Sequence, residues 1–347
     1  MRATFFAVAF ASFMVVVANG LPAATFPTFV SFDPPGSTGT TPRGINASGV
    51  IVGNYLAGSG ISTISHAFLR TADGAFTTID PPDAVRATVA TGINDSGTIT
   101  GTYEDASSDV HGFLRSAAGA YLSFAVPGAA GATPFSINAS GAVTGICVVD
   151  GITEESFIRD ASGNFTTISM PGSDFFAQVI NGAGAVAGQS DDPVSLVHHG
   201  FLRSPAGVIT IFDAPGAGQT AGLGTIALGM NYLGTITGYY FDAQSKMHGF
   251  ERNSKGEFIT FEDPNARGGS NQGTVPLVIN SAGLVAGSVY GPGFVSGFVR
   301  TASGTFDDFQ APQNLNTFPQ AMNSGGSVTG YYYEGSVSHG FVLIPAP

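Results

Sequence analysis

The phrase "NASGVIVG" at residues 46–53 is the first of seven copies of one pattern along this 347-residue chain. Each copy reads Asn-x-x-Gly, one variable residue, Ile or Val, one variable residue and Gly, and successive copies lie 43 to 50 residues apart. The copies begin at Asn46, Asn94, Asn138, Asn181, Asn231, Asn280 and Asn323. A recurring period of this size is typical of a repeat architecture, in which each copy is one supersecondary unit.

Each copy of the phrase predicts a β-hairpin. Asn followed three residues later by Gly suits a tight turn, with Asn capping the turn and Gly in the left-handed conformation. The segments on either side, such as "TVATGI" (88–93) and "TITGTY" (98–103), have the alternating pattern of strands. Gly inside the second strand indicates close approach of another backbone. We interpret the seven glycines as strands crowded around a common axis.

A third and a fourth strand follow each hairpin. The third strand reads "HGFLR" at 111–115 and 199–203, and similar segments occupy the same place in the other copies. After the first six copies comes a short polar turn with Gly, then a further strand that ends near Pro. Four short antiparallel strands per ~45 residues is the size of a propeller blade.

The seventh copy ends at "HGFVLIPAP" (339–347) without a fourth strand, and a strand of that kind, "FPTFVSFDPP" (26–35), stands before the first copy. We therefore expect residues 26–34 to pair beside 339–344, which would remove an exposed edge. The predicted fold is all-β, a seven-bladed β-propeller of four-stranded antiparallel blades whose ring is closed by the N-terminal strand pairing with the C-terminal blade. An open solenoid of the same units is the alternative.

Composition agrees with a large exported β domain. The chain has 49 Gly, 20 Pro, only 10% charged residues and a net charge of −12, which argues against nucleic-acid binding. Arg2 precedes an apolar run that ends in small residues, which predicts a signal peptide at 1–20 and a single propeller domain at 21–347. A membrane anchor is the alternative for the apolar run. We expect a secreted or periplasmic monomer with no membrane span after cleavage.

The units "GINDSG" (92–97) and "HAFLR" (66–70) resemble the tandem repeat called the extracellular HAF repeat, named after His-Ala-Phe. The resemblance extends over nearly all of residues 21–347. It implies an exported, repetitive protein of a family with no established activity. Ser156 and Ser296 stand around the place of the His in two units, so the His is not essential to every unit.

Five histidines share one repeat position, namely His66, His111, His199, His248 and His339. They could form a ring of ligands for a metal or an anion, or each could fix one blade to the next by a hydrogen bond. Copies around a ring lie far apart, whereas zinc needs ligands within ~2.0–2.3 Å of one ion, so we favour the structural interpretation.

The other recurring polar residues also have structural interpretations. The Arg that ends the third strand, as in Arg70, is expected to pair with backbone carbonyls or acids of the adjacent blade, with a substrate clamp as the alternative. Asn46, Asn94 and Asn138 match the glycosylation sequon, but the turn already explains them. Cys147, the only cysteine, is expected to be an inert buried thiol.

The segment "SDDPVSLVHHG" (190–200) is the densest polar cluster and could hold a cation. Adjacent residues of an extended chain point to opposite faces, so at most one of each acid or His pair could converge. We expect no metal and no cofactor.

The loops between second and third strands and those between blades vary in length, and they share one face, where binding usually occurs. The candidate ligand residues on that face are Tyr103, Glu104, Asp191, His199, Tyr240 and Tyr332. Aromatic rings with acids suit stacking on sugars or capture of a cationic or peptide partner. We expect a non-enzymatic binding or surface-interaction scaffold for an extracellular glycan or a cell-surface protein. The alternatives are a polysaccharide hydrolase or lyase with its site in the axial funnel, and a structural or adhesive protein.

Overall fold

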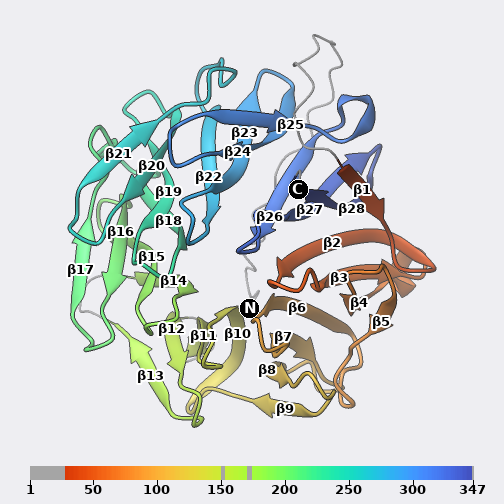
Figure 1. The fold of residues 1–347 in the computed structure, drawn as a ribbon. Helices are drawn as coiled ribbons and strands as arrows, with labels where there is room; N and C mark the ends of the chain where they lie inside the picture. Colours follow the sequence, from red (N-terminus) through yellow and green to blue (C-terminus); the bar gives the residue numbers. More distant parts are fainter. Residues whose placement is uncertain (1–27, 150–152, 170–173, 346–347) are drawn as a thin grey trace.

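The structure, a computed structural model, describes residues 28–149, 153–169 and 174–345. Figure 1 shows the strands of this all-β chain arranged in a ring around a central axis. Two 3-10 turns, η1 (Gly60–Ser62) and η2 (Pro312–Asn314), are the helical elements of these ranges. In the same ranges, no helix has the length and apolar character needed to cross a membrane. The predicted signal peptide at 1–20 lies outside the described residues.

Each of the first six repeat units contains an inner, a second, a third and an outer strand, paired antiparallel in that order. The first unit comprises β2 (Ser37–Ile45), β3 (Ile51–Ala57), β4 (Ile64–Arg70) and β5 (Phe76–Thr78). The second comprises β6 (Ala87–Ile93), β7 (Ile99–Glu104), β8 (Val110–Arg115) and β9 (Tyr121–Phe124). The third comprises β10 (Ala129–Ile137), β11 (Val143–Val149), β12 (Thr153–Arg159) and β13 (Phe165–Ile168).

The next three units repeat this order. The fourth unit comprises β14 (Asp174–Ile180), β15 (Val186–Asp191), β16 (His198–Arg203) and β17 (Ile209–Phe212). The fifth comprises β18 (Gly224–Met230), β19 (Ile236–Phe241), β20 (Met247–Arg252) and β21 (Phe258–Phe261). The sixth comprises β22 (Gly273–Ile279), β23 (Val285–Gly291), β24 (Phe294–Arg300) and β25 (Phe306–Phe309).

The two ends of the chain share the last sheet. Its strands β26 (Thr317–Met322), β27 (Val328–Glu334) and β28 (Val337–Ile344) are followed at the outer edge by β1 (Thr28–Phe32). Thr28 pairs with Ile344 and Phe32 pairs with Gly340. The predicted pairing of the N-terminal strand with the last strand is therefore confirmed for the described residues.

The seven repeated asparagines form a cycle of hydrogen bonds near the hairpin turns. The Oδ1 atom of Asn46 accepts hydrogen bonds from the backbone N–H groups of Ser48 and Val50, as expected for a turn cap. Its Nδ2 atom donates to the carbonyl oxygen of Asn94, and the same bond runs from each Asn to the next around the ring. Asn323 donates to the carbonyl oxygen of Asn46 at 3.1 Å, so the cycle of seven bonds returns to its start.

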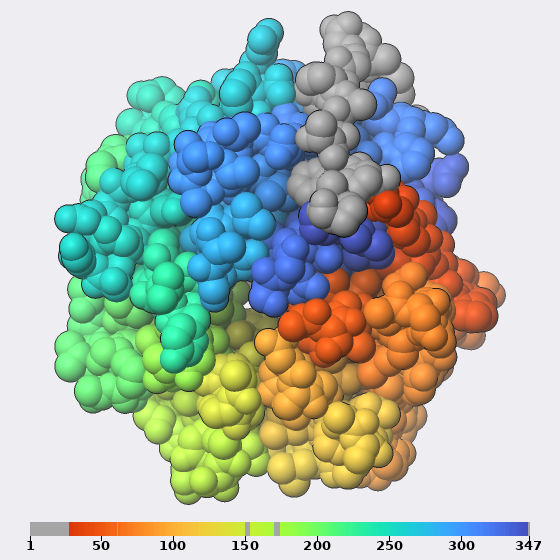
Figure 2. Space-filling view, in the orientation of Figure 1, coloured from red at the N-terminus to blue at the C-terminus, as the bar shows by residue number. Residues whose placement is uncertain are grey.

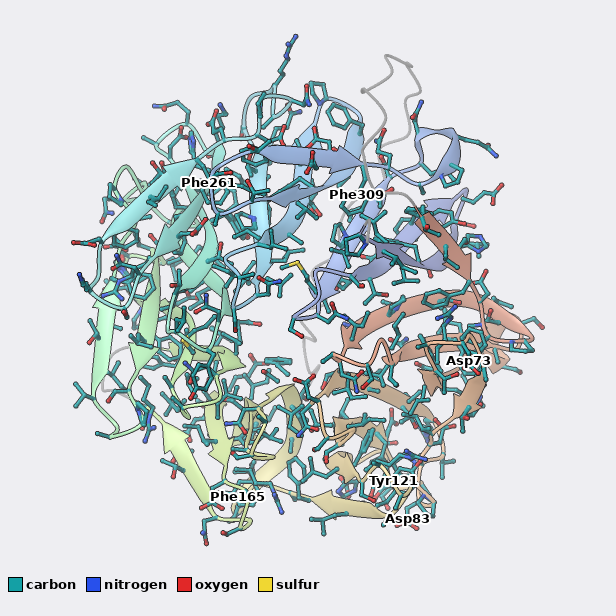
Figure 3. All side chains as sticks on the ribbon, in the orientation of Figure 1. Asp73, Asp83, Tyr121, Phe165, Phe261 and Phe309 are labelled. Carbon is teal, nitrogen blue, oxygen red and sulfur yellow. The ribbon has the colours of Figure 1, made fainter. Side chains whose placement is uncertain are left out.

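Aromatic residues fill the space between strands of neighbouring units. The Phe of the third strand is fully buried in every unit, as Phe68, Phe113, Phe157, Phe201, Phe250, Phe298 and Phe341. Phe68 packs with Phe32 of the N-terminal strand and with Val342 of β28. Figure 3 shows Phe165, Phe261 and Phe309 farther out, on the outer strands. The core is thus a set of small clusters that join consecutive units.

Candidate functional site

Every inner strand carries a β-bulge at the same place, three residues before the repeated Asn. In β2, for example, the register shifts between Pro42 and Gly44, which leaves Arg43 as the extra residue. The seven bulged residues are Arg43, Thr91, Phe135, Gln178, Leu228, Leu277 and Gln320. A bulge bends its strand and re-aims a side chain, and bulges are frequent beside functional sites.

The bulge explains the Gly that recurs in the second strand of every unit. A Cβ atom on Gly53 would lie 2.2 Å from the carbonyl oxygen of Thr41 and 2.7 Å from the Cα atom of Pro42, next to the bulge. The corresponding carbonyl of the inner strand lies 2.0 to 2.2 Å from the Cβ position of every equivalent Gly. The expected close approach of another backbone is confirmed, but that backbone is the inner strand of the same unit, which corrects the interpretation that the glycines reflect strands crowded around a common axis.

The bulged residues line a cavity of about 220 Å³ on the axis of the ring. Figure 2 shows the molecule hollowed at its centre. The neighbouring residues on the inner strands, among them Ile45, Gly92 and Ser136, complete the lining. Arg43 is the one ionisable side chain among the described lining residues, which include no Asp, Glu, His, Lys, Cys or Tyr.

Arg43 lies in an unusual environment for a cation. It is an exposed residue that lines the cavity, and its Nε atom donates to Oδ1 of Asn54 at 3.1 Å. Desolvation by the surrounding protein lowers the pKa of Arg43, and interaction with the Tyr331 phenol partly opposes this shift. No acidic side chain of the described chain forms an ion pair with Arg43.

Tyrosines of the fifth to seventh units gather on one side of the ring. Desolvation raises the pKa values of Tyr239 and Tyr331 to about 12, and it also raises the pKa of Tyr290. The ring of Tyr331 stacks on Phe318 with centroids 5.1 Å apart. These phenols therefore stay protonated at neutral pH and can donate hydrogen bonds.

Three of the predicted ligand residues are tyrosines whose rings the structure buries. Tyr103, Tyr240 and Tyr332 are 4%, 7% and 8% exposed. Each ring stacks on the His of the adjacent third strand, with centroids 4.9 to 5.3 Å apart. Their hydroxyl groups face neighbouring strands, as in the 2.6 Å contact of Tyr332 with Ser31. These rings pack within the blades and have no free face for stacking on a sugar.

The other predicted ligand residues are half-buried and paired. Glu104 forms an ion pair with Arg86 at 3.5 Å. Asp191 accepts hydrogen bonds from Gln189 and His198. His199 bonds Asp213 at 2.8 Å. The structure therefore does not bring the six predicted residues together at one point.

The segment 190–200 divides as the alternation of an extended chain predicts. His198 bonds Asp191, while His199 bonds Asp213, which directly follows the outer strand β17. Asp192 caps the intervening turn by accepting from the N–H groups of Val194 and Ser195. Within the described ranges, no group of three or more His, Cys, Asp or Glu side chains is placed to hold a metal ion.

The repeated histidines bond acids of their own unit, which corrects the expectation of bonds from one blade to the next. His66 and His199 reach Asp80 and Asp213 at the end of the outer strand. His339 reaches Asp33 at 2.7 Å, and Asp33 lies just after the N-terminal strand β1. The N-terminal segment therefore supplies to the last unit the Asp that follows the outer strand in the first and fourth units.

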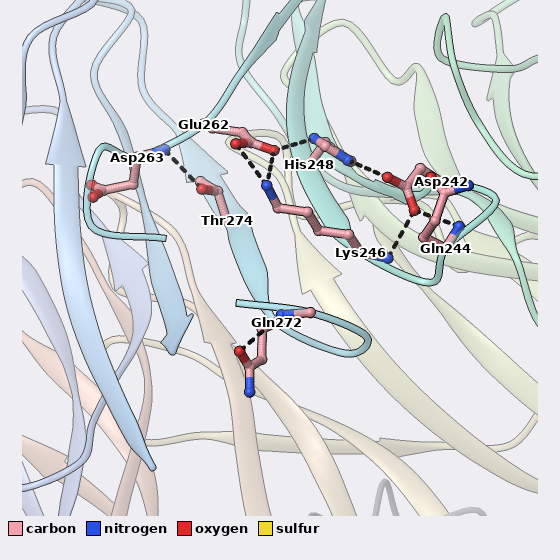
Figure 4. Close-up of polar contacts among 9 residues, drawn as sticks. Asp242, Gln244, Lys246, His248, Glu262, Asp263, Gln272 and Thr274 are labelled. Atoms are coloured by element: carbon pink, nitrogen blue, oxygen red, sulfur yellow. Dashed lines mark hydrogen bonds and ion pairs between the residues drawn. The ribbon is translucent and has the colours of Figure 1, made fainter. Parts of the chain in front are cut away.

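Figure 4 shows the most extensive of these networks, in the fifth unit. His248 contacts Asp242 through Nε2 at 2.9 Å and Glu262 through Nδ1 at 2.5 Å. Lys246 forms an ion pair with the same Glu262 at 2.8 Å. Each charged group therefore already has a protein partner.

The pairing of the second and third strands corrects which residue of the third unit occupies the position of the repeated His. Ser296 occupies the position of the repeated His, opposite Val289, but in the third unit Glu155 occupies it, opposite Cys147. Ser156 stands instead at the position of Gly112 and bonds backbone groups of the next inner strand. Cys147 is 1% exposed, and burial raises the pKa of its thiol to about 11, as expected for an inert buried Cys.

The arginines that end the third strand act as predicted. Arg70 donates to the carbonyl oxygen of Thr71 at 3.3 Å and lies over the ring of Phe32, 4.7 Å from its centroid. Arg300 forms an ion pair at 2.5 Å with Glu251 of the preceding unit. These contacts connect neighbouring units and do not place the guanidinium groups at a common site.

The bulged residues are the part of the site that was missed from the sequence. A signal was present, because the seven positions three residues before the Asn carry five different residue types between otherwise similar strands. An alternating pattern cannot show which of these side chains face the axis, because a bulge adds a residue and breaks the period of two.

The fold is similar to that of several solved β-propeller-like proteins. A streptogramin B lyase is 14% identical with a TM-score of 0.56, over 91% of this chain and 97% of that chain. Virginiamycin B lyase from Staphylococcus aureus is 13% identical with the same TM-score, over 91% and 99%. A prolyl endopeptidase is 8% identical with a TM-score of 0.56, over 90% of this chain and 50% of that chain.

No family model and no curated protein matches the chain. At these identities the structural likeness shows the fold alone. It establishes an all-β, propeller-like scaffold.

Proposed function

We propose that the chain is a closed seven-bladed propeller of the extracellular HAF-repeat type that works as a secreted, non-enzymatic binding module, with its ligand in the axial cavity. Two observations support closure, namely the pairing of β1 with β28 and the return of the Asn cycle from Asn323 to Asn46. A closed ring leaves no strand edge open to other chains.

The seven bulges carry the proposal of binding. Each bulge turns a side chain toward one cavity, and the seven side chains differ in type although the hairpins around them are alike. A β-bulge that recurs in every unit with varied side chains suits ligand recognition on a rigid scaffold. The cavity volume of about 220 Å³ is below the ~300–1,000 Å³ of pockets that enclose drug-sized ligands. The ligand is therefore a small molecule, or the terminal group of an extracellular glycan or surface protein.

A polysaccharide hydrolase or lyase is less well supported. Such an enzyme needs a pair of groups that can exchange protons with the substrate. Among the described residues that line the cavity, Arg43 is the one ionisable group, and arginine does not serve as an acid–base catalyst at neutral pH. The acids of the His networks are already paired, as Figure 4 shows for Glu262 and Asp242.

Binding in the cavity can be tested with a variant that fills it. The double variant Leu228→Trp/Leu277→Trp adds two large rings to the lining. Purified wild-type protein should be stabilised in a thermal-shift screen of monosaccharides, uronic acids, amino acids and short aliphatic acids. The filled variant should lose that shift while circular dichroism shows an unchanged fold. An equal shift in both proteins would place binding elsewhere and refute the proposal.

A further inference from the structure

We propose that the axial cavity binds a small carboxylate with an apolar body, and that Arg43 holds the carboxylate group. Because this inference rests on the proposed function, it names the class of ligand for the same cavity. This ligand class follows from Arg43, the one charged residue among the described lining residues, and from the order of the other side chains around the cavity.

Arg43 is available to an anion. Its Nε atom bonds Asn54, and its two terminal nitrogens have no hydrogen-bond or ion-pair partner within the described part of the chain. The arginines that end the third strands differ, since Arg70 and Arg300 use a terminal nitrogen on a carbonyl oxygen or a carboxylate. Two parallel N–H groups of a guanidinium match the two oxygens of a carboxylate.

The positive charge of Arg43 is opposite in sign to the net charge of the whole chain. The protein carries a net charge of −12, yet the described residues that line the cavity include no Asp or Glu. Cavity walls of low dielectric constant focus the field of a single cation and raise the local concentration of anions. A guanidinium partly desolvated by protein is stabilised by a paired anion, so the site favours an acid over its neutral analogue.

The bulged residues are polar from Gln320 through Arg43 to Thr91 and apolar at Leu228 and Leu277, with Phe135 and Gln178 between Thr91 and Leu228. In the order of units around the ring, Gln320 and Thr91 flank Arg43. Gln320 uses one N–H on the carbonyl oxygen of Pro319, which leaves its second N–H for a ligand. Leu228 and Leu277, which are neighbours on the other side of the ring, have only apolar side chains to offer. A ligand with a carboxylate at one end and an apolar body at the other fits both parts.

The charge count favours a carboxylate over a phosphate. One guanidinium balances one negative charge, and the lining offers no second cation for the extra charge of a phosphate monoester. An unpaired charge in a confined site has a high desolvation cost. A neutral sugar would leave Arg43 without an anion.

The test compares acids with their amides. Binding of benzoate, hexanoate, benzamide and hexanamide is measured by ligand-observed NMR and isothermal titration calorimetry on wild type, Arg43→Gln and the filled variant Leu228→Trp/Leu277→Trp. The matched control is Arg86→Gln, because Arg86 is an exposed arginine paired with Glu104 outside the cavity. Circular dichroism and thermal melting check the fold of every variant.

At least one acid should bind wild type and Arg86→Gln with equal Kd, and at least tenfold more tightly than its amide. Arg43→Gln should remove this tenfold preference, and the acid's affinity should fall as salt concentration rises. If acid and amide bind equally, or Arg43→Gln leaves the preference intact, while the filled variant loses binding, the carboxylate inference is wrong and the cavity proposal stands. If no acid binds wild type, the carboxylate inference is wrong, and the thermal-shift screen on wild type and the filled variant decides the cavity proposal. If the filled variant binds like wild type, both are refuted.

Discussion

Two rings of residues lie three positions apart in each unit, the bulged residue within the inner strand and the Asn directly after it, and the two rings differ in composition and in contacts. The Asn ring consists of seven identical, buried residues, and the side chain of each donates to the backbone carbonyl oxygen of the next. The bulge ring consists of five residue types that face a cavity, and its one cation has no acidic partner among the described residues. The Asn is the same in all seven units because every unit uses it for the same hydrogen bonds. The bulged residue varies among units because the seven side chains together line one cavity.

Deleting the strand that joins the two ends of the chain should have the largest effect on stability, because the Asn ring and the bulge ring both depend on closure of the propeller. A chain lacking residues 28–34 loses β1 and the Asp33 partner of His339. We expect loss of cooperative folding, since the exposed edge of β28 and the uncovered aromatic core remove a large part of the ~5–15 kcal/mol that stabilises a typical domain. Circular dichroism melting and size-exclusion chromatography measure this. Ser31→Ala, which removes one hydrogen bond of the same strand, is the control. A truncated monomer that melts like wild type would contradict closure by β1.

Gly101→Val should have the next largest effect, because it tests the bulge itself. The new Cβ atom would lie 2.1 Å from the carbonyl oxygen of Val89, so the bulge must shift. We expect the free energy of unfolding to fall by roughly 3 kcal/mol or more, the range of severe core disruption. Gly269→Ala, where no heavy atom lies within 4 Å, is the control and should change it little. Urea denaturation compares the two, and equal losses would mean that the bulge is not the reason for the Gly.

Asn138→Ala tests the Asn ring. It removes the acceptor for the N–H groups of Ser140 and Ala142 and the donor to the carbonyl oxygen of Asn181. At about 0.5–1.5 kcal/mol for each hydrogen bond, we expect a loss of roughly 2–4 kcal/mol in urea denaturation. Ser140→Ala, which removes one bond to the same Asn, should cost less than half as much. Equal losses for the two variants would show that the ring contributes little.

Asp263 departs from the repeat and provides a pH-dependent test. Its backbone N–H bonds Thr274 as that of Ala214 bonds Thr225, so it stands where another unit buries Ala. Burial, with Asp308 nearby, raises the pKa of Asp263 to about 7, above the ~3.9 expected in the unfolded chain. The folded protein then binds the extra proton, so the contribution of Asp263 to stability should be most favourable below about pH 4 and be lost as pH rises toward 7. We expect Asp263→Ala to raise the melting temperature more at pH 8 than at pH 5. An equal change at both pH values would contradict the raised pKa.

Substitutions in the bulge ring should affect stability least. Thr91→Ala and Phe135→Leu leave the bulged backbone in place and change side chains that face the cavity. We expect changes in the free energy of unfolding below about 1 kcal/mol, since no tightly packed core atom is removed. Ligand binding in the cavity should change more than stability. Losses as large as that of Asn138→Ala would remove the distinction between the two rings.

Much of the architecture could be predicted from local pattern. The Asn-x-x-Gly hairpins, the alternation of the flanking strands and the missing outer strand of the last unit are visible in the sequence, because turn chemistry and strand period are local properties. The burial of Cys147 and the carbonyl contacts of Arg70 followed from position in the repeat. The pairing of β1 with β28 followed from counting strands.

The candidate site depended on contacts that no local pattern contains. A bulge shifts the alternation by one residue, so only the folded backbone decides that Arg43 and Gln320 face the axis while Asn46 turns to its neighbour. Packing of consecutive units decides that Tyr103, Tyr240 and Tyr332 are buried against histidines. The sequence by itself thus determined the repeated unit and the order of its strands, since these follow from neighbours along the chain. The tertiary structure decided which seven side chains share one cavity, since that depends on residues some 40 to 50 positions apart being brought around a common axis.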